Sequence, residues 1–87
     1  MRFVKVPQVD EERLDDELIL LHPKTLQVKF LNETATVLWD ALGILPSDDE
    51  LAALLVEARP EIGSDVARTV VGTFLDELLA AGLIERQ

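Results

Sequence analysis

The segment from Leu18 to Ala35 constrains the fold of this chain more than any other part of it. Residues 18–21 form an apolar run of strand length, and His22-Pro23-Lys24 is typical of a turn. Residues 25–31 then alternate in polarity, and Asn32 stands where a helix N-cap is expected. The segment therefore predicts two antiparallel strands that lead directly into a helix.

The second of these strands has two different faces. Leu26, Val28 and Phe30 share one face, and the other carries Thr25, Gln27, Lys29 and Leu31. This alternation is typical of an antiparallel sheet with one buried side. Residues 2–6 alternate more weakly and predict a further strand, whereas the acidic residues 10–16 are expected to form a loop or a frayed strand.

Three helices are expected after the strands. The first follows Asn32 and ends at Gly43, the second begins at Ser47 and stops at Pro60, and the third runs from about Ser64 to Ala81. Leu83-Ile84 then either covers the core or adds a short strand. The fold class is therefore α+β, with a three-stranded antiparallel sheet followed by three helices.

The length of 87 residues supports one domain, residues 1–87, with a modest core. The chain has no cysteine, which excludes disulfides and thiol chemistry and fits a reducing compartment. It also has no apolar stretch of the roughly 20 residues that a membrane span needs. We therefore expect a soluble, cytoplasmic protein.

The net charge of −9 argues against nucleic acid and anionic membranes as partners. Eight basic residues stand against seventeen acidic ones, and the basic residues are scattered along the chain. Proteins that bind DNA need clustered Lys and Arg to replace the phosphate counterions. A partner that is basic or apolar is easier to accommodate.

A search for catalytic groups finds none. His22 is the single histidine, and it is expected to be an exposed turn residue. No catalytic triad can be assembled, no Gly-rich phosphate loop exists, and the acidic clusters fit solvated surfaces and helix N-termini. We therefore expect a protein that is not an enzyme and that holds no metal and no cofactor.

The chain resembles the PqqD-like family over roughly residues 17 to 85. The resemblance lies in the two strands, in Leu31-Asn32-Glu33-Thr34-Ala35, in the helix with Trp39 and in the ending from Phe74 to Ile84. Family members are peptide-recognition domains of pathways that modify ribosomally made peptides, and their fold is winged-helix-like. Many relatives carry Thr-Gly where this chain has Thr25-Leu26.

The resemblance implies that the domain binds the leader segment of a precursor peptide and delivers it to a modifying enzyme or leader peptidase. The leader would add as a strand along residues 25–31, an edge of about 23 Å, and fill a groove against the third helix. The expected contacts are Thr25, Leu26, Gln27, Val28, Lys29, Phe30 and Leu31 on the strand and Ala67, Val70, Val71 and Phe74 on the helix. The resemblance extends to both the pyrroloquinoline quinone and the lasso-peptide branches.

Two other functions remain open from the residues. The first is a winged-helix DNA-binding regulator, although residues 64–81 offer Arg68 as their one basic residue, against Asp65, Asp76 and Glu77. The second is a dimerisation module that pairs through the same strand edge. The peptide chaperone is expected to be a monomer or a weak homodimer.

Overall fold

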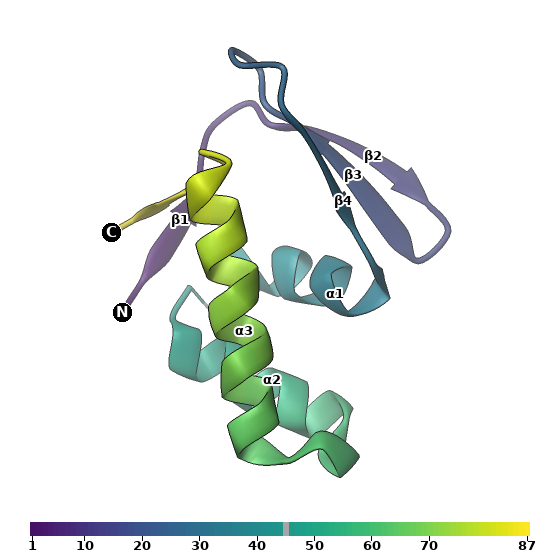
Figure 1. Cartoon of the computed structure of the whole chain (residues 1–87), viewed down its shortest axis with the longest axis vertical. Helices are drawn as coiled ribbons and strands as arrows, with labels where there is room; N and C mark the ends of the chain where they lie inside the picture. Colours follow the sequence, from purple (N-terminus) through teal and green to yellow (C-terminus); the bar gives the residue numbers. More distant parts are fainter. Residues whose placement is uncertain (45) are drawn as a thin grey trace.

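Three antiparallel strands form the main sheet in the computed structural model, which describes residues 1–44 and 46–87. They are β2 (Asp10–Leu14), β3 (Glu17–Leu21) and β4 (Val28–Leu31), in the order β2-β3-β4 (Figure 1). The sheet and the three helices that follow it confirm the predicted α+β class. The acidic stretch expected to be a loop or a frayed strand is an edge strand of this sheet.

The strand predicted near the N-terminus belongs to a second, smaller sheet. β1 (Phe3–Lys5) pairs antiparallel with β5 (Ile84–Arg86), so the two ends of the chain lie side by side (Figure 1). Residues 84–86 thus form the short strand that was one of the two expectations for the C-terminus. The three-stranded sheet obtains its third strand from β2 instead of from β1.

The turn between β3 and β4 is longer than predicted, so residues 25–27 lie outside the strand. The backbone N–H of Leu26 donates to the carbonyl of His22 at 3.1 Å, and Leu26 has a φ of 61°. This left-handed conformation is unfavourable for a residue with a Cβ, and glycine adopts it freely.

The buried side chain of His22 stabilises the turn between β3 and β4. Its side chain is 9% exposed, which corrects the expectation of an exposed turn residue. Nδ1 accepts hydrogen bonds from the backbone N–H groups of Lys24 and Thr25, both at 3.1 Å. The imidazole therefore replaces backbone partners that the tight turn cannot supply.

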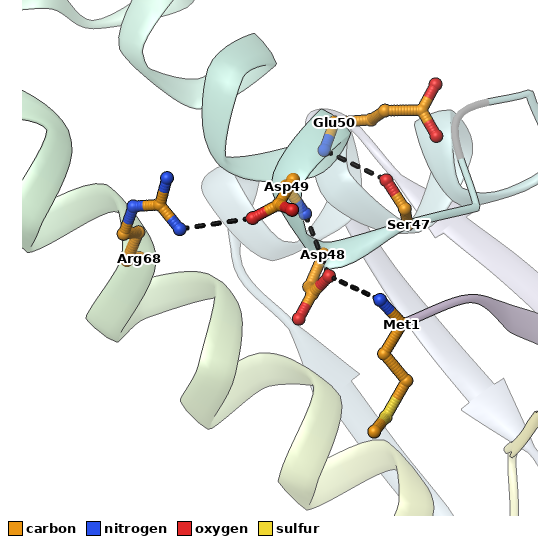
Figure 2. Close-up of polar contacts among 6 residues, drawn as sticks. All are labelled: Met1, Ser47, Asp48, Asp49, Glu50 and Arg68. Carbon is orange, nitrogen blue, oxygen red and sulfur yellow. Dashed lines mark hydrogen bonds and ion pairs between the residues drawn. The ribbon is translucent and has the colours of Figure 1, made fainter.

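Each of the first two helices begins at its predicted cap. In α1 (Glu33–Leu42) the Asn32 side chain accepts from the N–H of Ala35 at 2.9 Å. In α2 (Asp48–Ala58) the Ser47 hydroxyl accepts from the N–H of Glu50 at 3.1 Å (Figure 2). These bonds satisfy N–H groups that a helix start leaves unpaired. A 3₁₀ turn, η1 (Pro60–Ile62), leads into α3 (Gly63–Ala80).

Two ion pairs converge on the start of α2 (Figure 2). The N-terminal ammonium of Met1 lies 3.2 Å from Asp48, and Arg68 of α3 lies 3.1 Å from Asp49. Partial burial by itself would raise the pKa of Asp48. The hydrogen bond from the ammonium, the N–H of Asp49 and the ammonium's charge outweigh that effect, so the pKa lies below its ordinary value.

The core lies between the inner face of the sheet and the three helices. Leu18 and Leu20 of β3 point inward, and Trp39 of α1 is fully buried with the Lys5 ammonium 4.5 Å from its ring centroid. One face of α3 completes the core. Gly72 lies off this face, and a Cβ at Gly72 would meet nothing within 4 Å, so no element approaches it closely. Among the described residues, no helix is long and apolar enough to cross a membrane.

Candidate functional site

A groove of about 470 Å³ separates β4 from α3. β4 leads directly into the start of α1, α3 passes in front of α1 (Figure 1), and residues of α1 line the groove between β4 and α3. The groove is lined from β4 and its end by Lys29, Phe30, Leu31 and Asn32, from α1 by Thr34, Ala35 and Leu38, and from α3 by Thr69, Val70, Thr73, Phe74, Glu77 and Leu78.

The floor of the groove is apolar and its walls are mixed. Leu31, Leu38, Phe74 and Leu78 are buried and form the floor, while Val70 is half-buried on the wall. Threonine hydroxyls and the Asn32 side chain stand around these apolar groups. An apolar concave surface with a few polar groups at its border is the usual composition of a binding site for a small ligand or a peptide side chain.

An ion pair joins the two sides of the groove. The Lys29 ammonium lies 3.1 Å from the Glu77 carboxylate, and their side chains are 31% and 55% exposed. Because the pair is solvated, its contribution to the stability of the fold is small. Its position connects the edge strand to α3, so it helps to set the width of the groove at the end nearest the C-terminus of α3.

β4 has an open backbone edge because β3 covers only one of its sides. The N–H of His22 donates to the carbonyl of Gln27 at 3.0 Å, and this pair fixes the register that continues as Leu21 opposite Val28. Antiparallel pairs alternate between hydrogen-bonded and non-bonded. The N–H and C=O groups of Val28 and Phe30 therefore point away from β3, toward the open edge beside α3.

The structure divides the predicted contact residues into three groups. Lys29, Phe30, Leu31, Val70 and Phe74 line the groove. The residues of the turn, Thr25, Leu26 and Gln27, lie before β4, and Val28 is 50% exposed on the sheet face that points away from the helices.

Ala67 and Val71 form the third group. They are 0% and 1% exposed and belong to the core, which corrects their assignment to the groove wall. The side of α3 that lines the groove therefore differs from the predicted one. It includes Val70 and Phe74 as predicted, but Thr73 and Glu77 take the place of Ala67 and Val71.

Sequence reasoning missed the residues that α1 and the polar positions of α3 supply. Helical spacing contained a signal for α3, since positions three and four residues after Val70 are Thr73 and Phe74, and Phe74 repeats the spacing with Glu77 and Leu78. Thr34 and Ala35 line the groove because the Asn32 cap starts α1 directly under the end of β4.

Nothing in the groove resembles a catalytic centre. Its ionisable residues, Lys29 and Glu77, are paired with each other. Within residues 1–44 and 46–87, no cluster of three or more His, Cys, Asp or Glu side chains is placed to hold a metal ion. The groove offers apolar contacts and backbone hydrogen bonds, which are means of binding.

Fold and groove together define a small winged-helix-like α+β domain with a cleft beside an open strand edge. The family model of coenzyme PQQ synthesis protein D (PqqD) matches residues 17–84, and this chain belongs to that family. The match covers β3, β4, the helices and the first residue of β5, whereas β2 precedes it.

A solved structure supports the same fold. It is described as TbiB1 in complex with the TbiA(beta) leader peptide, and it superimposes with a TM-score of 0.85 at 21% sequence identity. The superposition covers 98% of this chain and 95% of that one. A search of the curated proteins found no match.

Proposed function

We propose that this protein is a non-catalytic peptide chaperone that binds the leader segment of a ribosomally made precursor peptide. It presents that segment to a modifying enzyme or leader peptidase in a pathway of the lasso-peptide or pyrroloquinoline quinone type. The observation that carries the proposal is the apolar groove beside the open edge of β4. Residues 1–87 act as one such domain, in the cytoplasm.

The leader joins the sheet as a fourth strand next to β4. The outward N–H and C=O groups of Val28 and Phe30 provide four backbone hydrogen-bonding groups, two from each residue. β4 has four residues, which span about 13 Å, so the docked segment is shorter than the 25–31 edge would have allowed. At about 0.5–1.5 kcal/mol for each hydrogen bond, the backbone alone supplies roughly 2–6 kcal/mol.

Side chains of the leader provide the remaining affinity and the selectivity. In an added strand every second side chain faces the groove, where Leu31, Val70 and Phe74 offer an apolar surface. One buried aliphatic or aromatic anchor contributes about 1.5–3 kcal/mol. Together with the hydrogen bonds, and after the ordering cost of the peptide, this is compatible with micromolar binding.

The relationship to TbiB1 supports the same proposal, since that protein has been solved with a leader peptide. The family match is consistent with it, and so is the absence of catalytic groups from the groove residues. DNA binding is disfavoured, because Arg68 of α3 is paired with Asp49 and the net charge is −9.

A titration of the ¹⁵N-labelled protein tests the proposal. The ligand is a synthetic leader peptide from the precursor gene that neighbours this one, and a scrambled peptide of equal composition is the control. We expect saturable amide shifts at residues 28–31 and 69–78. Shifts confined to α2, or none at millimolar peptide, would contradict leader binding at this groove.

A further inference from the structure

The face of the main sheet that points away from the helices is apolar at its centre. The strand register places Ile19 opposite Phe30 and Leu21 opposite Val28 on this outer face. Leu18 and Leu20, which alternate with them along β3, point into the core. Phe30 is 72% exposed and Val28 50%. We call the set Ile19, Leu21, Val28 and Phe30 the outer patch.

The folding of the domain does not require the outer patch to be apolar. Antiparallel sheets with one face on a core usually carry polar residues on the other face. Two paired strands that present four adjacent apolar side chains to water form the kind of patch that marks an interaction site. Phe30 also borders the groove, but Ile19, Leu21 and Val28 do not line it, and the leader's anchors enter from the opposite face of β4.

Carboxylates border the outer patch on the side of β2. Glu12 lies opposite Ile19 and Asp10 lies opposite Leu21, and Glu17 follows at the end of β3 on the same face. All three are exposed. The border therefore carries negative charge next to an apolar centre.

The basic side chains of β2 and β4 are directed to the inner side of the sheet. Arg13 of β2 lies 3.1 Å from Asp40 of α1, and Lys29 of β4 lies 3.1 Å from Glu77 of α3. Neither neutralises the acidic border. This face is therefore complementary to a partner surface that has an apolar centre with Lys or Arg around it.

We propose that the outer patch docks the enzyme that acts on the bound peptide, through an apolar area of that enzyme surrounded by basic side chains. The identity of the partner rests on the proposed function. A second copy of this chain is the less suitable occupant, since it has the same net charge of −9 and the same acidic border. An anionic lipid surface is unsuitable for the same reason.

The location of the patch connects docking to peptide binding. A leader strand beside β4 extends the sheet, and its outward side chains lie next to Val28 and Phe30. The enzyme then meets one continuous surface formed by the domain and the leader. Peptide and enzyme should therefore bind with positive coupling, each raising the affinity of the domain for the other.

The experiment measures binding of the purified modifying enzyme or leader peptidase encoded beside this gene, with and without the leader peptide. Phe30→Glu and Ile19→Thr alter the outer patch. Ile19 lies on the central strand and does not neighbour the added peptide, so its variant separates docking from leader binding. Val37→Glu, on the exposed side of α1, is the matched control for added charge on an apolar surface residue.

We expect Phe30→Glu to weaken enzyme binding at least tenfold and Ile19→Thr several-fold, with Val37→Glu within twofold of the wild type. Ile19→Thr should keep its affinity for the leader. Binding should also weaken as salt is raised from 50 to 500 mM. Circular dichroism confirms that each variant is folded.

Two results would overturn the proposal: folded outer-patch variants that bind the enzyme as the wild type does, or sedimentation that shows a dimer dissociated by Phe30→Glu. The leader titration is read separately. Loss of enzyme docking with intact leader binding supports the patch, whereas a protein that docks the enzyme without binding the leader contradicts the proposed function and leaves the patch in place.

Discussion

The ammonium of Lys29 and the carboxylate of Glu77 lie 3.1 Å apart and connect β4 to α3 across the groove. Residues 48 positions apart in the chain thus meet at the end of the proposed peptide site. Substitutions in this ion pair can therefore change the width of the groove without altering its apolar floor.

Reversing the charge of Lys29 should weaken leader binding. Lys29→Glu places two carboxylates together, and we expect affinity to fall about three- to tenfold as they move apart, with a change in stability within about 1 kcal/mol. The double variant Lys29→Glu/Glu77→Lys restores the attraction and should recover most of the affinity in isothermal titration calorimetry. If the swap recovers nothing, Lys29 acts on the peptide directly.

A charge placed in the groove should weaken leader binding strongly, whereas the same charge one helical turn away should not. Val70→Asp puts a carboxylate where the leader's apolar anchor is expected, so we predict at least a tenfold loss of leader affinity. Val66→Asp, on the same helix, is the matched control, since Val66 is 49% exposed and outside the groove. Fluorescence anisotropy of a labelled leader compares the two, and equal losses would argue against the groove.

If the leader pairs with the backbone of β4, the backbone N–H groups of every second residue should contribute to binding. Val28→Pro removes an N–H that points to the open edge and leaves the bonds to β3 in place, so the variant should fold and bind the leader about tenfold more weakly. Val28→Thr keeps the N–H and should bind normally. N-methylation of successive leader residues should reduce affinity at alternate positions, and a uniform effect would contradict strand addition.

Leu26 should be replaceable by glycine with a gain in stability. Its φ of 61° is strained for leucine, and its side chain is 67% exposed, so little burial is lost. We expect Leu26→Gly to raise the free energy of unfolding by about 0.5–1 kcal/mol. Urea denaturation followed by the fluorescence of buried Trp39 measures the change, and a loss of stability would mean that the leucine side chain contributes contacts.

Gly72 offers a second stabilising change. It lies inside α3, and a Cβ there meets open space, so Gly72→Ala should add about 0.5–1 kcal/mol from helix propensity. Leader affinity should remain unchanged, because Gly72 lies outside the groove. Thermal denaturation and the anisotropy assay provide the two measurements, and a weaker leader interaction would place Gly72 within reach of the peptide.

The sequence alone predicts the order of elements after residue 17 with few errors. Asn32 and Ser47 have side chains that cap a helix start locally, so their role does not depend on distant residues. For β2 the sequence leaves both a loop and a frayed strand open, for the opposite reason. Its residues 10–14 are all exposed, and they form a strand because β3 supplies hydrogen-bond partners.

Fold class, negative charge, helix caps and the resemblance to the family were therefore present in the sequence itself. Tertiary structure decided which face of β4 meets α3 and which side of α3 borders the groove. Both faces of β4 carry apolar residues, Leu31 on one and Phe30 on the other, so alternation shows that the faces differ without showing which is inside. That choice depends on the layer packed against the strand, which local residue order does not encode.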